Sequence, residues 1–451
     1  MKKLTKKSQL IFYALGGLGV NMLNLMMGSY LCSAIIASGF STEAAKTHTF
    51  QNTDLVIVAV WAVFGVIAKV IDGIIDIPMA AFADNLKSRF GRRRPALLIG
   101  LIPTISAYLL FLIVPNNGQA TLLNTIYLGV VLCLFYIAYT LTMVTYYATF
   151  TEIVDNVKAR NMISNVKSFF DVLYYIFGYV GVVAMLKGLN IRIVALLVLP
   201  MALTMLIPFF MIKEPDNRED KGEKVKALNL ATSLKYTLKN RKFIVWMIVY
   251  SCMTFGVQLF LSGINEYFTG TGMNMMFVMM GSFAPVPLTL YIYTKIFNKY
   301  GFGFAFRYAV LSYSFGMLSM FGVSFIAAGI ARTILAILSG VFCSLAIGAL
   351  FSVAYSIPAQ LAAEEQEKTG VSNSAMYFAV QGLFAGIASA IGSYVVLNIL
   401  KSITGVIEDP FTVNPMYFVT LICAAATFVS FLLTFKLPKS LVNLGKADNN
   451  D

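Results

Sequence analysis

Three ionisable residues interrupt one apolar stretch near residues 54–82: Lys69, Asp72 and Asp76. The stretch is long enough to cross the hydrocarbon of a membrane, where a charged side chain costs roughly 2.5–3.5 kcal/mol on insertion scales. Asp72 and Asp76 are four residues apart, so on a helix both carboxylates lie on one face at roughly 5–6 Å. We therefore expect each of the three charges to have a partner or a function.

Two carboxylates this close repel each other in a poorly solvated site. Either one of them takes up a proton or a cation lies between them, and both outcomes describe a binding site for a coupling ion, Na⁺ or H⁺. A structural interpretation also stands: Lys69 neutralises Asp72, and Asp76 faces a water-filled cavity that holds no ligand.

A strongly basic turn follows this stretch, between the second and third predicted spans. It contains Asp84, Arg89, Gly91, Arg92 and Arg94. One interpretation is a cluster that only sets membrane topology. The other is a cytoplasmic gate, in which Asp84 and the arginines pair with each other and with a neighbouring helix end in one conformational state. Exposed ion pairs contribute about 0–1 kcal/mol each, so such a gate biases an equilibrium without locking it.

The composition indicates which elements position these residues. Of the 451 residues, 58% are hydrophobic and 12% are charged, whereas soluble domains average roughly 25% charged residues. Runs of membrane-spanning length lie near residues 10–38, 54–82, 96–115, 121–150, 168–187, 192–212, 243–268, 273–297, 305–328, 333–358, 371–400 and 414–436. Ten-residue alternating strands are absent from the sequence, so we expect an all-α integral membrane protein of twelve transmembrane helices.

A polar stretch, residues 213–242, divides the chain nearly in half. We expect a six-helix bundle in 1–212, a cytoplasmic linker in 213–242, and a second six-helix bundle with a short cytoplasmic tail in 243–451. Within the linker, Leu228–Leu238 is apolar at helical spacing, which is equally consistent with a helix on the membrane surface and with a solvated linker.

The formal charge of +13 indicates sidedness rather than nucleic-acid binding. Most Lys and Arg residues lie in the N-terminus and the even-numbered loops, which predicts cytoplasmic termini in the cell inner (plasma) membrane. MKKLTKK and the apolar run behind it resemble a signal peptide, but we interpret the run as the first retained helix. We expect a monomer whose partners are membrane lipid and a small-molecule solute.

Enzyme and metal signatures are absent from the sequence. The five cysteines lie in separate apolar runs without a CxxC pair, and no GxxxxGK[ST], HExxH or GxGxxG motif is present. We therefore expect no catalytic residues, no metal site and no cofactor apart from the coupling ion.

Asp72, Asp76, Asp84 and the sequence RFGRRRP resemble the signature of the glycoside/pentoside/hexuronide:cation symporters, the branch of the major facilitator superfamily that includes melibiose permease. The resemblance extends loosely over the whole chain, and its specific part is the region from Lys69 to Pro95. It implies the two-bundle major facilitator fold and symport by alternating access.

The resemblance also implies roles for individual residues. Asp72 and Asp76 match the carboxylates that bind Na⁺, Li⁺ or H⁺ in the family, Thr140 falls where a hydroxyl on the fourth helix assists, and Lys69 matches a basic position beside them. Four positions depart from the family pattern. Asn21 and Met143 replace acidic residues that grip the sugar, Ala385 lies where a lysine is expected, and Ile75 replaces a polar residue of the cation site.

Polar residues on the same helices are candidates for the wall of the solute cavity. These are Asn21, Asn24, Tyr147, Lys167, Asp171 and Gln258. Hydrogen bonding between helices is the alternative role for each of them.

We expect a secondary transporter that couples movement of a small solute, a sugar or glycoside, to a cation. Because the positions that grip the sugar are changed, cation-coupled transport of an amphiphile such as a lysolipid is an alternative. A membrane sensor that keeps the fold without transport is a third.

Overall fold

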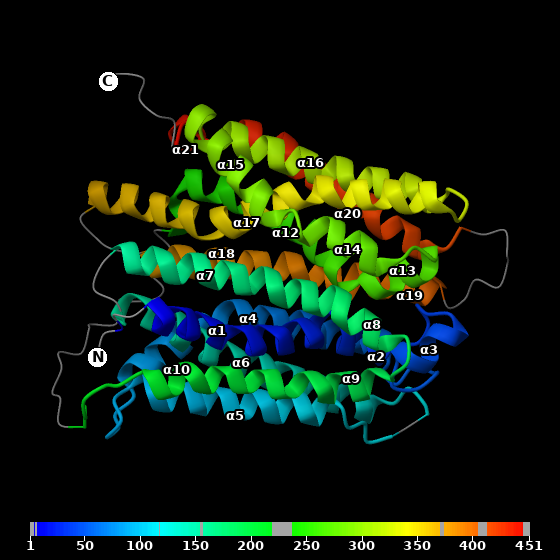
Figure 1. Ribbon diagram of the computed structural model, residues 1–451, viewed down its shortest axis with the longest axis horizontal. Coiled ribbons are helices and arrows are strands. Elements are labelled where there is room, and N and C mark those ends of the chain that lie inside the picture. Colours follow the sequence, from blue (N-terminus) through cyan, green and yellow to red (C-terminus); the bar gives the residue numbers. More distant parts are fainter. Residues whose placement is uncertain are drawn as a thin grey trace. The chain divides into compact units, whose positions relative to one another are not determined.

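The computed structural model describes residues 4, 7–116, 118–153, 157–218, 237–369, 374–404 and 413–444 (Figure 1). In this part of the chain all regular secondary structure is helical, which confirms the all-α prediction. The chain divides into two compact units, Met1–Val225 and Lys226–Asp451. The expected linker limits, 213–242, stay a prediction, and most of the segment Leu228–Leu238 lies outside the described residues.

The helices of the first unit are α1 (Lys7–Leu25), η1 (Met26–Leu31), α2 (Cys32–Ala34), α3 (Thr42–His48), α4 (Val58–Asn85), α5 (Arg93–Phe111), α6 (Leu122–Glu152), α7 (Val157–Ile176), η2 (Phe177–Gly181), α8 (Val182–Leu186), α9 (Ile191–Val198), η3 (Leu199–Met205) and α10 (Leu206–Met211). Those of the second unit are α12 (Arg241–Ser262), α13 (Ile264–Thr271), α14 (Met275–Phe283), α15 (Val286–Tyr300), α16 (Phe302–Ser324), α17 (Ile330–Thr369), α18 (Ser374–Ala390), η4 (Ile391–Val396), α19 (Leu397–Thr404), η5 (Pro415–Tyr417), α20 (Phe418–Leu433), η6 (Thr434–Lys436) and α21 (Lys439–Val442).

The number of membrane spans agrees with the sequence. Within the described residues, 11 continuous helical segments are long and apolar enough to cross a membrane. The twelfth span is α16, whose 23 residues reach about 34 Å at 1.5 Å per residue. It is not among the 11 segments, and it contains Arg307 and the serines at 312, 314, 319 and 324.

Polar side chains mark where several of these helices begin. The N-cap side chains of Ser41, Thr121, Asn190, Asn240 and Asn274 each accept a hydrogen bond from a backbone N–H in the first turn of the helix that follows. The first N–H groups of a helix have no partner within the helix, so these caps fix the start of α3, α6, α9, α12 and α14.

In the first unit, α6 packs against α4 and α5, and α1 packs against α7 and η3 (Figure 1). Two contacts depend on glycine. A Cβ on Gly19 would lie 1.7 Å from the carbonyl oxygen of Met201, and a Cβ on Gly100 would lie 2.4 Å from Oγ1 of Thr142. The close approach holds α1 on η3 and α5 on α6, which brings the polar residues of α1, α4, α6 and α7 into one unit.

Candidate functional site

The two aspartates lie on α4, as the sequence predicts. The apolar residues from Val58 onward form a helix of 28 residues that continues through Asp72 and Asp76 and contains Pro78. Proline has no backbone N–H, so the carbonyl oxygen of Ile74 loses its usual helical partner beside the acidic pair.

Asp72 is held by two of the predicted residues, Thr140 and Lys69. Its Oδ1 accepts a hydrogen bond from Oγ1 of Thr140 at 3.2 Å, and its Oδ2 lies 3.4 Å from Nζ of Lys69. The Lys69 ammonium also lies 4.1 Å from the ring centroid of Tyr136, which adds a cation–π contact. The side chains of Lys69 and Asp72 are 19% and 28% exposed, so the pair is largely shielded from water.

Asp76 differs from its neighbour. It is partly buried and makes no hydrogen bond or ion pair with any residue that the structure describes. The Asp72 carboxylate is therefore neutralised within the protein, and the Asp76 carboxylate keeps its oxygens available to a ligand. Carboxylate and hydroxyl oxygens are the ligands that hard cations prefer, and a carboxylate without a partner is also a site for a proton.

A second polar cluster joins α1, α6 and α7. Nδ2 of Asn21 donates to Oδ1 of Asp171 at 3.5 Å, and the hydroxyl of Tyr139 donates to Oδ1 of Asn21 at 3.0 Å. Lys167 and Asp171 form an ion pair, and Nζ of Lys167 lies 5.0 Å from the ring centroid of Tyr147. The Asp171 side chain is only 9% exposed, so its charge depends on these partners.

The structure thus brings together four of the six predicted solute-site residues, Asn21, Tyr147, Lys167 and Asp171. Asn24 lies one turn further along α1 and is partly buried. Gln258 lies on α12, in the other unit. Sequence reasoning missed Tyr139, although its position eight residues before Tyr147 places both rings near one face of α6.

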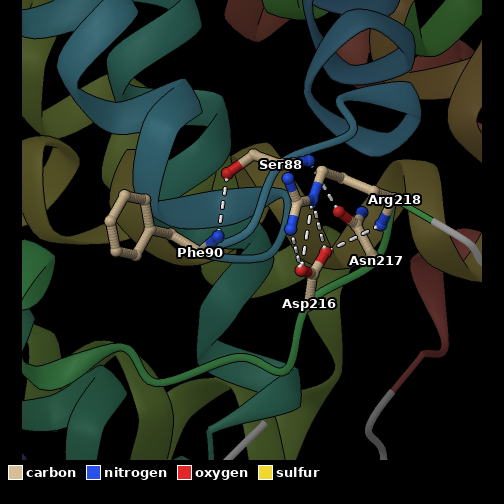
Figure 2. Close-up of polar contacts among 5 residues, drawn as sticks. All are labelled: Ser88, Phe90, Asp216, Asn217 and Arg218. Atoms are coloured by element: carbon tan, nitrogen blue, oxygen red, sulfur yellow. Dashed lines mark hydrogen bonds and ion pairs between the residues drawn. The ribbon is translucent and has the colours of Figure 1, made fainter.

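The basic turn between α4 and α5 is bound by the segment that follows α10 (Figure 2). The side chain of Asn217 accepts from the backbone N–H of Ser88 at 2.8 Å and donates to the carbonyl oxygen of Leu86 at 2.9 Å. Oε2 of Glu214 accepts from the backbone N–H of Arg93 at 2.7 Å, where the positive end of the α5 dipole favours a carboxylate. The sequence analysis assigned both residues to the linker and missed these contacts.

The predicted gate residues have other contacts in this turn. Gly91 adopts φ +81° and packs against Glu214, Arg89 lies over the Phe90 ring at 4.6 Å, and Arg94 lies over the Phe209 ring at 4.7 Å. Arg92 is the N-cap residue of α5.

The Asp84 side chain lies outside the described residues, so its pairing with the arginines stays a prediction. Beside the turn, an exposed pair joins Asp216 and Arg218 at 2.7 Å (Figure 2). Hydrogen bonds from Arg218 hold the pKa of the Asp216 carboxyl below its usual value.

The second unit contains a charge pair that the sequence analysis did not single out. Oε1 of Glu266 on α13 lies 2.8 Å from Nζ of Lys401 on α19, with side-chain exposures of 0% and 1%. Both residues lie within or beside apolar runs. The free-energy cost of a charged side chain in the membrane, which identified Asp72 and Asp76, would have identified Glu266 and Lys401 too.

Two helical units, twelve helical segments of membrane-spanning length and polar clusters within apolar helices define a polytopic membrane protein. The family profile described as "MFS/sugar transport protein" matches residues 12–438, and the chain belongs to this family. Membership confirms the expected placement in the major facilitator superfamily, and the protein is a transporter rather than an enzyme.

Solved structures support the same fold. A variant of the nucleoside transporter NupG is 13% identical, with a TM-score of 0.62 over 96% of this chain and 100% of that one. The xylose transporter XylE from E. coli is 15% identical, with a TM-score of 0.55 over 95% and 97%. A POT family transporter is 13% identical, with a TM-score of 0.59 over 96% of each chain. No curated protein matches the sequence significantly.

Proposed function

We propose that this protein is a symporter that couples entry of a small hydroxylated solute, a sugar or nucleoside, to Na⁺ or H⁺. The observation that carries the proposal is that one helix, α6, contributes residues to both polar clusters. Thr140 contacts Asp72 of the acidic pair, and the preceding residue, Tyr139, contacts Asn21 of the second cluster. A change at either cluster therefore acts on the same helix.

The acidic pair is the proposed cation site. With Lys69 already beside Asp72, an added cation or proton neutralises mainly Asp76, which has no partner among the described residues. Neutralisation of Asp76 removes the repulsion between the two carboxylates, so α4 can adopt a conformation that two neighbouring negative charges disfavour. In an alternating-access cycle, that conformation is the one that binds solute.

The cluster around Asn21 is the proposed solute site. Asp171 offers acceptors to sugar hydroxyls, Lys167 and Asn21 offer donors, and the Tyr147 ring offers an apolar face for sugar C–H groups. Asn21 and Met143 replace acidic residues of the related symporters. Asp171, contributed by α7 to the same cluster, replaces the missing carboxylate.

A pentose is the chemistry common to a nucleoside and to xylose, the solutes named for two structural neighbours. We therefore place pentoses and nucleosides first among the solutes to be tested. The proposal also includes monomeric function in the plasma membrane with cytoplasmic termini.

The test is solute-driven cation flux in proteoliposomes that contain the purified protein. Wild-type protein should move Na⁺ or H⁺ when one pentose, nucleoside, hexose or glycoside is added, and Asp76→Asn should abolish solute accumulation against a gradient. Asp216→Asn, which changes an exposed carboxylate, is the matched control and should transport normally. Uphill uptake by Asp76→Asn would refute the coupling role. Movement of labelled lysolipid with no response to any sugar or nucleoside would favour an amphiphile as substrate instead.

A further inference from the structure

The seventh span is broken close to one end. α12 ends at Ser262, Gly263 has φ −96° and ψ 13°, and α13 begins at Ile264 as a separate helix of eight residues. A Cβ on Gly263 would lie 2.7 Å from Cδ1 of Leu397, the first residue of α19. The break is therefore packed tightly against the eleventh span.

The eleventh span is irregular at the same level. The π-helical segment η4 directly precedes α19, and the Ser262 hydroxyl donates to the Ser393 hydroxyl within η4 at 2.7 Å. π-Helical turns are rare and occur frequently at functional sites, and the wider turn loosens the backbone hydrogen-bond ladder. The break in the seventh span and the π-helical segment of the eleventh span are therefore in direct contact.

Beyond these two points, a buried ion pair joins the span ends. Glu266 and Lys401 are almost completely excluded from solvent, and Oε2 of Glu266 has no hydrogen-bond partner among the residues that the structure describes. Desolvation offsets part of the attraction within such a pair, so the pair stabilises the closed state by much less than the bare attraction between two charges 2.8 Å apart. Stability alone is therefore a weak reason for two charges at this depth.

Two hydrogen bonds of α13 lead to helices other than α19, and η5 packs against both α13 and α19. The hydroxyl of Tyr267 donates to the carbonyl oxygen of Met320 at 3.1 Å, and Nη2 of Arg332 donates to the carbonyl oxygen of Thr271 at 2.5 Å. These bonds tie α13 to α16 and α17. The ion pair joins α13 directly to α19, and we call the boundary between these two helices the seam.

We propose that Glu266 and Lys401 form a conformational latch that closes this seam. When the pair separates, α13 and α19 move apart about Gly263 and η4, and water that enters the seam hydrates both charges. The closed state is the one described here. This inference concerns movement within the second unit and does not depend on the identity of the solute or the coupling ion.

The test measures access to the seam in protein reconstituted in nanodiscs. Leu397 is 3% exposed and contacts Gly263, so Leu397→Cys places a thiol in the seam. The rate of maleimide labelling at this thiol is compared in two backgrounds, native and Glu266→Gln/Lys401→Met. The double variant removes both charges, so it leaves no uncompensated buried charge to prevent folding. Subtraction of labelling without Leu397→Cys corrects for the five native cysteines.

We expect labelling about tenfold faster in the double variant, since about 1.4 kcal/mol in an opening equilibrium is a factor of ten. The charge swap Glu266→Lys/Lys401→Glu should return the rate towards the native value, and Lys46→Met, in an exposed pair, should not change it. Hydrogen exchange of the α13 amides, measured without the added cysteine, should be faster in the double variant than in the native protein. In the charge swap it should return towards the native rate. Native labelling and exchange rates in the double variant would show that the pair has no latch function and overturn the proposal.

Discussion

At the scale of single residues, the register of α6 decides which groups meet. Tyr136 and Thr140 are four residues apart and contact Lys69 and Asp72, whereas Tyr139 and Tyr147 contact Asn21 and Lys167. One helix therefore presents two adjacent faces to two clusters. Small changes at α6 side chains should separate cation binding from solute binding.

Thr140→Val removes a hydroxyl and keeps the shape of the side chain. In the proposed site the Thr140 oxygen also serves as a ligand for Na⁺, and a polar contact with a charged group contributes roughly 1.5–3 kcal/mol, so the apparent Na⁺ affinity in solute-driven flux should fall about ten- to a hundredfold. Thr140→Ser keeps the donor and should stay within a few-fold of wild type. Equal affinities for the Val and Ser variants would show that the hydroxyl does not contribute to cation binding.

Asp171→Asn should weaken solute binding and leave cation binding unchanged. It leaves the Lys167 charge without its carboxylate and removes acceptors from the solute site, so solute affinity should fall at least about tenfold. Cation binding measured without solute should not change, because the polar partners of Asp171 in the described residues are Asn21 and Lys167 rather than the acidic pair. Glu43→Gln, in an exposed pair with Lys46, is the control. A loss of cation affinity in Asp171→Asn would contradict the separation of the two sites.

At the scale of elements, the turn between α4 and α5 is shaped by the segment after α10. Glu214 and Asn217 bind three backbone groups of the turn and of the first residue of α5, so α4, which carries the acidic pair, is anchored at its end by a distant part of the sequence. Gly91 makes this possible, because its positive φ and missing side chain leave room for Glu214.

Gly91→Ala tests that anchoring. A Cβ at this position would lie 2.2 Å from Cβ of Glu214, and the left-handed backbone costs roughly 1–2 kcal/mol for a residue other than glycine. Gly118→Ala is the matched control, since Gly118 has φ +94° and nothing within 4 Å of the added Cβ. We expect a lower midpoint of thermal unfolding for Gly91→Ala than for Gly118→Ala, measured by fluorescence-detected size exclusion. Equal midpoints would show that the contact with Glu214 adds nothing beyond backbone strain.

At the scale of the whole molecule, charge distribution and an even number of spans predict the sidedness. Twelve spans place both ends of the chain on one side, and the excess of basic residues in the N-terminus and the even-numbered loops predicts that this side is the cytoplasm.

Reporter fusions test this sidedness. A green fluorescent protein fused after Asp451 should fluoresce, because it folds in the cytoplasm, and an alkaline phosphatase inserted at Asn116, between α5 and α6, should be active outside. The reversed pattern of reporter activity would contradict the topology.

The sequence by itself determined the class of protein and its span pattern, because hydrocarbon imposes a length and polarity on every span that can be read locally. The same cost singled out Asp72, Asp76 and Lys69, whose spacing along one helix needs no tertiary information. Only the tertiary structure decided which residues of different helices meet. Asp171 beside Asn21, Glu214 at the start of α5 and Lys401 beside Glu266 are each separated by more than a hundred residues, and local periodicity contains no information about such contacts.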